Sequence, residues 1–277
     1  MKFIVNADDF GITLGVSNGI IKGMKEGIIT DTSALVNSKD FEESARLAKE
    51  AGITSMGVHL TITFLDPVLD KSMVKSIVDE NGNFFRKPNL IPKDYKKEEV
   101  KAELKAQIEK FLATGLKLNH LDSHHGISVL DAEVFDIVLD LGREYNIPIR
   151  REDTVARDAA IKGKFSAAGA KGADYLCADF SSLSVREEYV MEILEKYKEV
   201  DSIYEFGGHP GFVDDELKAI TSFADEREND LAVFMSEKVI DYIKDNNIEL
   251  ISYSTLIWYS ADINLIFYIT WEIISWK

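Results

Sequence analysis

The sequence of 277 residues contains one cysteine, five prolines and five histidines, and its acidic residues outnumber its basic ones by 48 to 32. The single cysteine, Cys177, excludes an internal disulfide framework and a cysteine-rich zinc site. The net charge of −16 disfavours binding to a nucleic-acid backbone or to an anionic membrane surface. Nothing near Met1 resembles a signal peptide. We therefore expect a cytoplasmic protein that binds neither nucleic acid nor a membrane.

The last part of the chain, residues 256–277, differs from the rest in composition. It is mostly apolar and holds all three tryptophans, but Asp262 and Glu272 interrupt it. No uncharged run therefore reaches the ~20 residues that a membrane span needs. Three interpretations stay open: a packed or dimer-forming extension, an artefact of the sequence, and an anchor at a membrane surface. Because a large exposed apolar area favours self-association, we expect a homodimer.

Strand-like and helix-like stretches alternate through residues 1–255. Apolar runs of strand length lie at residues 3–7, 33–36, 56–62, 118–122, 147–150, 175–178, 203–207 and 249–253. Helical patterns lie at residues 16–26, 41–51, 98–112, 132–145, 156–168, 184–197 and 225–246. Eight such units predict a single α/β domain, a distorted (β/α)8-like (TIM-type) barrel more than an open doubly wound sheet. Residues 63–96 are too long for an ordinary loop and indicate a lid-like insertion.

Two adjacent carboxylates stand where the first predicted strand ends. Residues 6–11 read Asn-Ala-Asp-Asp-Phe-Gly, and active sites of α/β proteins lie at this end of the strands. Asp8 and Asp9 repel one another unless a cation or a shared proton relieves the repulsion. The alternative interpretation is that one aspartate caps the following helix.

Histidines lie within or at the ends of three further strands. Residues 119–126, Asn-His-Leu-Asp-Ser-His-His-Gly, hold three of the five histidines together with Asp122. Residues alternate in an extended chain, so His120, Asp122 and His124 should share one face. A carboxylate and imidazoles on separate strand ends predict a metal site with open positions for water. His59 in Gly-Val-His-Leu-Thr could instead be a core residue, and His209 in Gly-Gly-His-Pro-Gly-Phe an incidental loop residue.

Taken in order, these four motifs resemble the YdjC-like carbohydrate deacetylase family, and the resemblance covers roughly residues 1–254. It implies a distorted (β/α) barrel that removes N-acetyl groups from small N-acetylglucosamine oligosaccharides such as diacetylchitobiose, possibly 6-phosphorylated, as in chitin degradation. Two features depart from the family pattern: Gly126 replaces a third consecutive histidine, and the aromatic extension continues past the usual end.

The resemblance also implies roles for individual residues. Asp9, His59 and His124 match the ligands of one divalent metal ion, Mg²⁺ or Zn²⁺. Asp8 matches the catalytic base, His209 the acid near the leaving group, and Arg150 an arginine that holds Asp8 ionised. We expect the substrate to be bound by these further residues: Asp122, His125, Phe84 and Phe85.

Two other functions stay open at this point. A metal-dependent sugar-phosphate isomerase or phosphoesterase could use the same fold, although no lysine stands within the motifs. A catalytically silent sugar-binding protein could keep the same pocket, although it would not need Asp8, both metal histidines and His209 together.

Overall fold

A computed structural model describes residues 1–177 and 184–256. The strands are β1 (Lys2–Phe10), β2 (Asp31–Ala34), β3 (Ser55–Leu60), β4 (Lys117–Ser123), β5 (Tyr175–Cys177), β6 (Ile203–Gly208) and β7 (Glu249–Leu250). The α-helices are α1 (Leu14–Glu26), α2 (Phe41–Glu50), α3 (Lys97–Leu112), α4 (Ala132–Glu144), α5 (Lys164–Ala167), α6 (Glu187–Tyr197), α7 (Asp215–Ile220), α8 (Asp225–Phe234) and α9 (Glu237–Asp245). Short 3-10 helices are η1 (Lys71–Met73), η2 (Lys75–Ile77), η3 (Pro88–Leu90), η4 (His124–Val129) and η5 (Glu152–Thr154).

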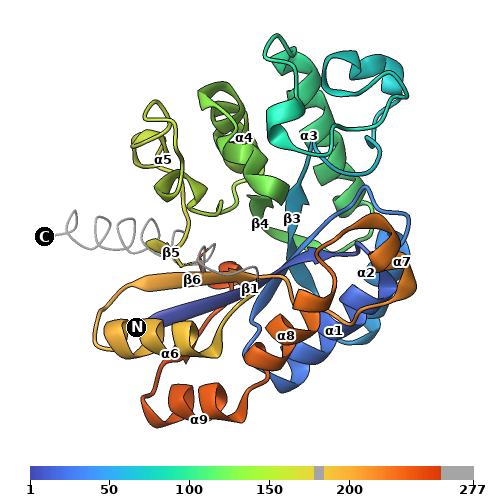
Figure 1. Cartoon of the computed structure of the whole chain (residues 1–277). Coiled ribbons are helices and arrows are strands. Elements are labelled where there is room, and N and C mark those ends of the chain that lie inside the picture. Colours follow the sequence, from blue (N-terminus) through green and yellow to red (C-terminus); the bar gives the residue numbers. More distant parts are fainter. Residues whose placement is uncertain (178–183, 257–277) are drawn as a thin grey trace, which may run out of the picture.

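The strands form one parallel sheet in the order β4-β3-β2-β1-β6-β5, and β7 pairs with the start of β1 (Figure 1). β1 lies in the middle and is buried over nearly its whole length. The register places Asn6 opposite Gly207 and His59 opposite Asp122. Because all strands run the same way, the polar motifs that end them meet at one edge of the sheet.

The predicted class, a single α/β domain with a parallel sheet, agrees with this architecture, whereas the eight-stranded barrel is not shown. The described part of the chain holds seven strands, and predicted strand 147–150 contributes only an isolated bridge between Ile149 and Leu121. Pro148 lacks an N–H group, so this stretch cannot complete a regular ladder. Three backbone hydrogen bonds still link it to its neighbours: from the N–H of Leu121 to the Pro148 carbonyl, from the N–H of Arg150 to the Leu121 carbonyl, and from the N–H of Ile149 to the Lys171 carbonyl.

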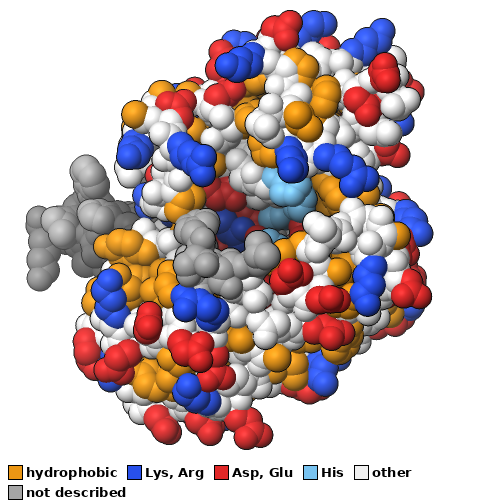
Figure 2. Space-filling model, in the orientation of Figure 1, with side chains coloured by type: hydrophobic (Ala, Val, Ile, Leu, Met, Phe, Trp, Pro, Cys, Tyr) orange, Lys and Arg blue, Asp and Glu red, His pale blue; other side chains and the backbone are white. Residues whose placement is uncertain are grey.

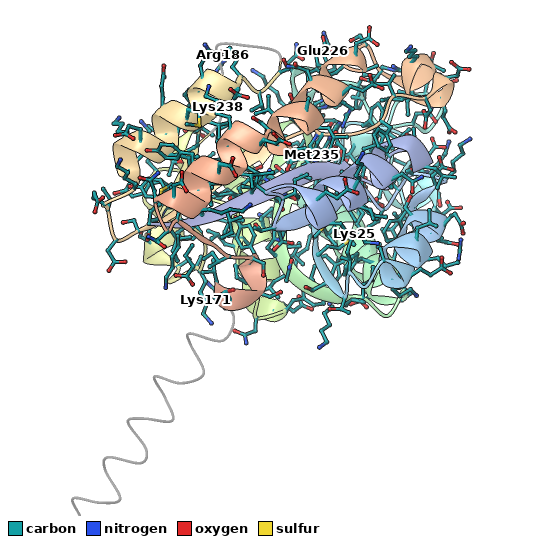
Figure 3. All side chains as sticks on the ribbon, turned by 90° about the horizontal axis from the view of Figure 1, so that it is seen from below. Lys25, Lys171, Arg186, Glu226, Met235 and Lys238 are labelled. Atoms are coloured by element: carbon teal, nitrogen blue, oxygen red, sulfur yellow. The ribbon has the colours of Figure 1, made fainter. Side chains whose placement is uncertain are left out.

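Two predicted helices differ from expectation. Predicted helix 225–246 is divided into α8 and α9 at Met235 (Figure 3). Ser236, which begins α9, is extended, and its hydroxyl donates to Glu187 of α6 at 2.7 Å, so a tertiary contact interrupts the helical pattern. Predicted helix 156–168 is reduced to α5, because Gly163 takes a left-handed conformation with a φ of 84°.

Nearly all buried apolar residues form one core around the sheet. A small separate cluster joins Ile4 of β1 to Ile251, Tyr253 and Leu256, which ties the end of the described chain to the central strand. Within residues 1–177 and 184–256, no helix has both the length and the apolar character that crossing a membrane requires. The rest of the apolar extension, and with it the predicted basis for a dimer, falls in residues 257–277, outside the described chain.

Two glycines of α1 differ in what surrounds them. A Cβ on Gly19 would lie 2.5 Å from the backbone nitrogen of Phe212, in the loop after β6. A Cβ on Gly23 would lie 2.4 Å from the end of the Ile29 side chain. The backbone of Phe212 cannot move aside as the end of the Ile29 side chain can. The lack of a side chain at Gly19 therefore allows α1 to lie this close to the loop.

We predict that Gly19→Ala destabilises the protein by ~1–3 kcal/mol through overpacking. Gly23→Ala should cost less, because Ile29 can change rotamer and alanine favours a helix by up to ~1 kcal/mol. Urea unfolding of both variants would measure the difference. Equal stability of the two variants would contradict the role given to Gly19.

Candidate metal and catalytic site

A hollow of about 460 Å³ opens where the loops after β1, β3, β4 and β6 meet. Acidic, basic and histidine side chains gather inside it (Figure 2). The residues predicted from the sequence that line it are Asp8, Asp9, His59, His124, His125, Arg150 and His209. Segments from the first residues of the chain to beyond residue 200 therefore contribute to one cavity.

A β-bulge allows both adjacent aspartates to face this hollow. Successive residues of a regular strand point to opposite faces of a sheet. The pairing of β1 with β2 is irregular between Ala7 and Phe10, and Asp9 has a φ of 67°. This left-handed conformation is strained for a residue other than glycine, and such strain is typical of functional sites. The bulge thus turns Asp9 toward the side that Asp8 already occupies.

Asp9, His59 and His124 converge around one point. One ligand-type atom from each lies within 4.8 Å of the others. The Oδ1 atom of Asp9 lies 3.4 Å from His59 Nε2 and 2.9 Å from His124 Nδ1. His59 presents Nε2 to this point because its Nδ1 lies 2.9 Å from Asp122 Oδ1, an arrangement in which a carboxylate orients a metal-binding imidazole. One carboxylate oxygen and two imidazole nitrogens suit a divalent transition ion.

Asp8, His59 and Asp122 form a second close group of possible ligand atoms, and the guanidinium of Arg150 binds both of its carboxylates. Arg150 places Nη1 2.8 Å from Asp8 Oδ2 and 2.9 Å from Asp122 Oδ2, and its Nη2 donates to Asp8 Oδ1 at 2.7 Å. Its Nε donates to Glu205 Oε1 at 2.7 Å. A guanidinium already supplies positive charge there, so the first group is the better candidate for a metal.

Charge pairing controls the ionisation of this site. Burial raises the pKa of Asp8, but Arg150 outweighs it, and the pKa falls below its ordinary value. Burial of Asp9 is outweighed by His124 and Arg227, and its pKa lies well below the ordinary value. Burial lowers the pKa of His59, yet nearby carboxylates, Asp122 foremost, raise it to about 9. Both aspartates are therefore ionised at neutral pH, and their surroundings favour additional positive charge.

Arg227 of α8 completes the surroundings of Asp9, although no sequence motif marked it. Its Nη2 donates to Asp9 Oδ2 at 2.7 Å, and its Nε donates to the carbonyl of Phe223 at 3.2 Å. The Arg227 side chain is 3% exposed. By engaging Oδ2, Arg227 leaves Oδ1 of Asp9 facing the two histidines.

His209 lies on the wall of the hollow, at the end of β6. Its backbone N–H donates to Asp230 at 2.9 Å, and the same carboxylate accepts from the N–H of Val185 at 2.7 Å. Its ring meets Phe223 edge to face, with centroids 5.3 Å apart. Burial lowers the pKa of His209, while the negative charges of Asp8 and Asp9 act in the opposite direction.

Two predicted substrate-binding residues and His120 lie at different depths. His125 is exposed at the hollow, and its Nδ1 lies 3.1 Å from Thr63 Oγ1. Asp122 lies below the hollow, where it orients His59. His120 is also buried and stacks on Tyr253 with centroids 4.1 Å apart, and it belongs to neither group of candidate ligands.

The predicted aromatic pair lies away from the main hollow. Phe84 is 3% exposed and lines an adjoining hollow of about 620 Å³, while Phe85 is half-buried against the core. Phe64, also within the 63–96 insertion, lines both hollows. The insertion thus borders the main hollow through Phe64.

Several buried polar residues of the site stand outside the four sequence motifs. Glu205 accepts a hydrogen bond from Arg150 and another from the hydroxyl of Tyr253. A charged residue between Tyr204 and Phe206 in an apolar strand was the available signal for Glu205. Arg227 lies in a helix rich in charged residues, where its sequence neighbours give no such signal.

The fold and the site define a class of protein: a single α/β domain with aspartates and histidines gathered at the carboxyl ends of parallel strands. Residues 2–245 match the YdjC-like protein family, and the chain belongs to that family, as its motifs indicated. It is 34% identical to a carbohydrate deacetylase of Clostridium beijerinckii and 32% identical to one of Listeria monocytogenes, over 92% of this chain and 100% of each relative.

Solved structures agree with this assignment. A protein of Enterococcus faecalis designated as a cellobiose-phosphate cleavage protein gives a TM-score of 0.85 at 31% identity, over 92% of this chain and 98% of that one. A lactam utilization protein of Thermus thermophilus gives a TM-score of 0.53 at 15% identity, over 91% of this chain and all of that one, a likeness of fold alone.

We predict that Arg150→Gln destabilises the metal-free protein by ~3–5 kcal/mol at neutral pH, because it leaves buried carboxylates without their partner. The loss should shrink as the pH falls below ~4. With Arg150 present, the pKa values of Asp8 and Asp122 are lowered, so their contribution to stability exists above ~pH 4 and disappears in acid. Urea unfolding between pH 3 and 8 would measure both trends; a pH-independent difference would contradict them.

Proposed function

We propose that this protein is a metal-dependent carbohydrate deacetylase. The observation that carries the proposal is one cavity that joins the Asp9–His59–His124 group to a buried Asp8–Arg150 pair and to His209. Relatives at 32–34% identity that are named carbohydrate deacetylases support the same reaction class.

Asp9, His59 and His124 would hold the divalent ion. A bound divalent ion polarises a carbonyl oxygen and lowers the pKa of water from 15.7 toward ~7. The imidazole-rich set favours Zn²⁺ or a similar ion, and Mg²⁺ would need more oxygen ligands.

Asp8 would accept the proton of the attacking water. It is not part of the candidate ligand group, and Arg150 keeps it ionised although it is buried. The same bidentate contact fixes the direction of its carboxylate. An ionised carboxylate of fixed direction beside a metal is suited to general base catalysis.

His209 would protonate the departing amine nitrogen. Its lowered pKa makes its protonated form a stronger acid than ordinary histidine. The hydrogen bond from its backbone to Asp230 fixes the loop that carries it.

The finer proposal is that the substrate is a small N-acetylglucosamine oligosaccharide such as diacetylchitobiose. The adjoining hollow shares Ile12 and Phe64 with the catalytic one, so the two are contiguous. Its lining includes the amides of Asn37 and Asn83, and the side-chain oxygen of Asn37 has no hydrogen-bond partner among the described residues. Amides beside aromatic rings suit sugar hydroxyls and ring faces, so this hollow would hold the sugar unit that is not deacetylated.

Acetate release from N-acetylated sugars, with and without Zn²⁺, Mg²⁺, Mn²⁺ or Co²⁺, tests the proposal. Isomerisation or phosphate release without acetate would favour the sugar-phosphate enzymes considered above. Saturable sugar binding without any turnover would favour a silent binding protein.

We predict opposite behaviour for the two adjacent aspartates. Asp9→Asn removes charge from the candidate ligand set, so metal binding should weaken and added metal should partly restore activity. Asp8→Asn should keep the metal and lower kcat by ~10²–10⁴ with little change in KM, because only the proton acceptor is lost. Metal titration of the apoprotein and steady-state kinetics would measure both effects.

The reverse pattern would exchange the two assignments. Full activity of both variants would rule out the proposed mechanism. His209→Ala should resemble Asp8→Asn in keeping the metal.

We predict that Arg86 distinguishes phosphorylated from unphosphorylated substrates. Arg86 lines the adjoining hollow, is exposed, and forms no ion pair with any described residue. If the substrate carries a 6-phosphate, Arg86→Ala should raise KM for it by ~10-fold, the equivalent of one charge-assisted hydrogen bond. The KM for unphosphorylated diacetylchitobiose should stay unchanged. Lys87→Ala, an exposed neighbour outside the lining, is the control, and equal effects of both variants on both substrates would contradict a phosphate contact.

A further inference from the structure

The turn that follows β4 has an unusual backbone conformation. His125 and Gly126 have φ angles of 55° and 64°, both in the left-handed region. Glycine adopts this region freely, whereas histidine does so only under strain. The same turn begins with His124, whose Nδ1 lies 2.9 Å from Asp9. Strained backbone persists only where its surroundings hold it in place.

Glu152 lies across the base of this turn and binds both of its ends. Its carboxylate accepts hydrogen bonds from the N–H and the hydroxyl of Ser123, at 3.2 and 2.7 Å, and from the hydroxyl of Ser128. The N–H of Ser128 donates to Ser123 Oγ at 3.0 Å. Ser123 immediately precedes His124, and Ser128 immediately follows Ile127. One buried carboxylate therefore joins the residues on either side of the four-residue turn.

Glu152 also lies close in sequence to a residue that contacts the proposed base. It stands two residues after Arg150, which binds Asp8. One short segment thus contacts the residue proposed as the base and the turn that carries a proposed metal ligand. Both oxygens of Glu152 already accept hydrogen bonds from the serines, so the geometry favours a supporting role over contact with the reacting atoms.

We propose that Glu152 is a positioning residue for the metal site: through Ser123 and Ser128 it holds the strained turn that directs His124 toward Asp9. The inference rests on the metal site of the proposed function. It predicts that loss of Glu152 weakens metal binding although Glu152 is not a ligand.

Titration of the metal-free protein with Zn²⁺, followed by calorimetry, tests the role of Glu152. Glu152→Ala should lower the Zn²⁺ affinity by ~10-fold or more, as is typical when a supporting partner of a metal ligand is removed. Saturating Zn²⁺ should restore most of kcat, because the ligands and Asp8 are still present. Ser128→Ala removes a single hydrogen bond and should lower the affinity by about fivefold. The double variant should bind Zn²⁺ no more weakly than Glu152→Ala, because both changes act on the same contact.

Glu103→Ala is the matched control. Glu103 is fully buried and accepts hydrogen bonds from the backbone N–H of Val68 and Leu69, at 2.9 and 3.0 Å, in a different loop. Both glutamate variants should lower Tm, but only Glu152→Ala should change the Zn²⁺ affinity relative to the wild type. Ser128→Ala leaves the carboxylate in place and keeps the test usable if Glu152→Ala does not fold.

The outcomes separate the two proposals. If the wild type binds none of Zn²⁺, Mg²⁺, Mn²⁺ and Co²⁺, the metal site of the proposed function is wrong. If the wild type binds Zn²⁺ and Glu152→Ala binds it equally tightly, only the role of Glu152 is wrong. Additive losses in the double variant, or an equal loss in Glu103→Ala, would also overturn that role.

Discussion

The arrangement of the site depends most on Arg150, because its guanidinium lies among three carboxylates inside the fold. Asp8, Asp122 and Glu205 approach its guanidinium from three strands, with N···O distances of 2.7 to 2.9 Å. Arg227 pairs with Asp9 in the same region, so four carboxylates face two guanidinium groups. Buried charge of one sign is unfavourable without compensation. His59 lies between Asp9 and Asp122, and the nearby carboxylates raise its pKa to about 9.

The residues proposed to carry the chemistry could be predicted from the sequence because each lies within or just after an apolar run of strand length. Parallel strands bring their carboxyl ends together, so Asp9, His59 and His124 meet although more than 100 residues separate the first from the last. Alternation along a strand, however, places Asp8 and Asp9 on opposite faces. Only the bulge in β1, where its pairing with β2 is irregular, brings them to the same side.

Where sequence reasoning failed, contacts between distant segments decided the structure. Arg227 and Glu152 stand in no motif, and their importance arises from partners far away in the chain, Asp9 for one and Ser123 for the other. Predicted helix 225–246 is interrupted between α8 and α9, where Ser236 binds Glu187 of another helix. The apolar residues at 147–150 indicated a strand, but the stretch contains Pro148. Proline has no N–H to donate, so only an isolated bridge forms there.

Two residues of the site, Asp9 and His125, have a strained backbone conformation. Asp9 and His125 both have left-handed backbone, and each belongs to a segment that a distant charged side chain holds: Arg227 binds Asp9, and Glu152 binds the serines around the His125 turn. Holding groups in one geometry before reaction lowers the reorganisation needed in the transition state. The charged residues outside the motifs therefore determine whether the motif residues stand at distances where they can act together.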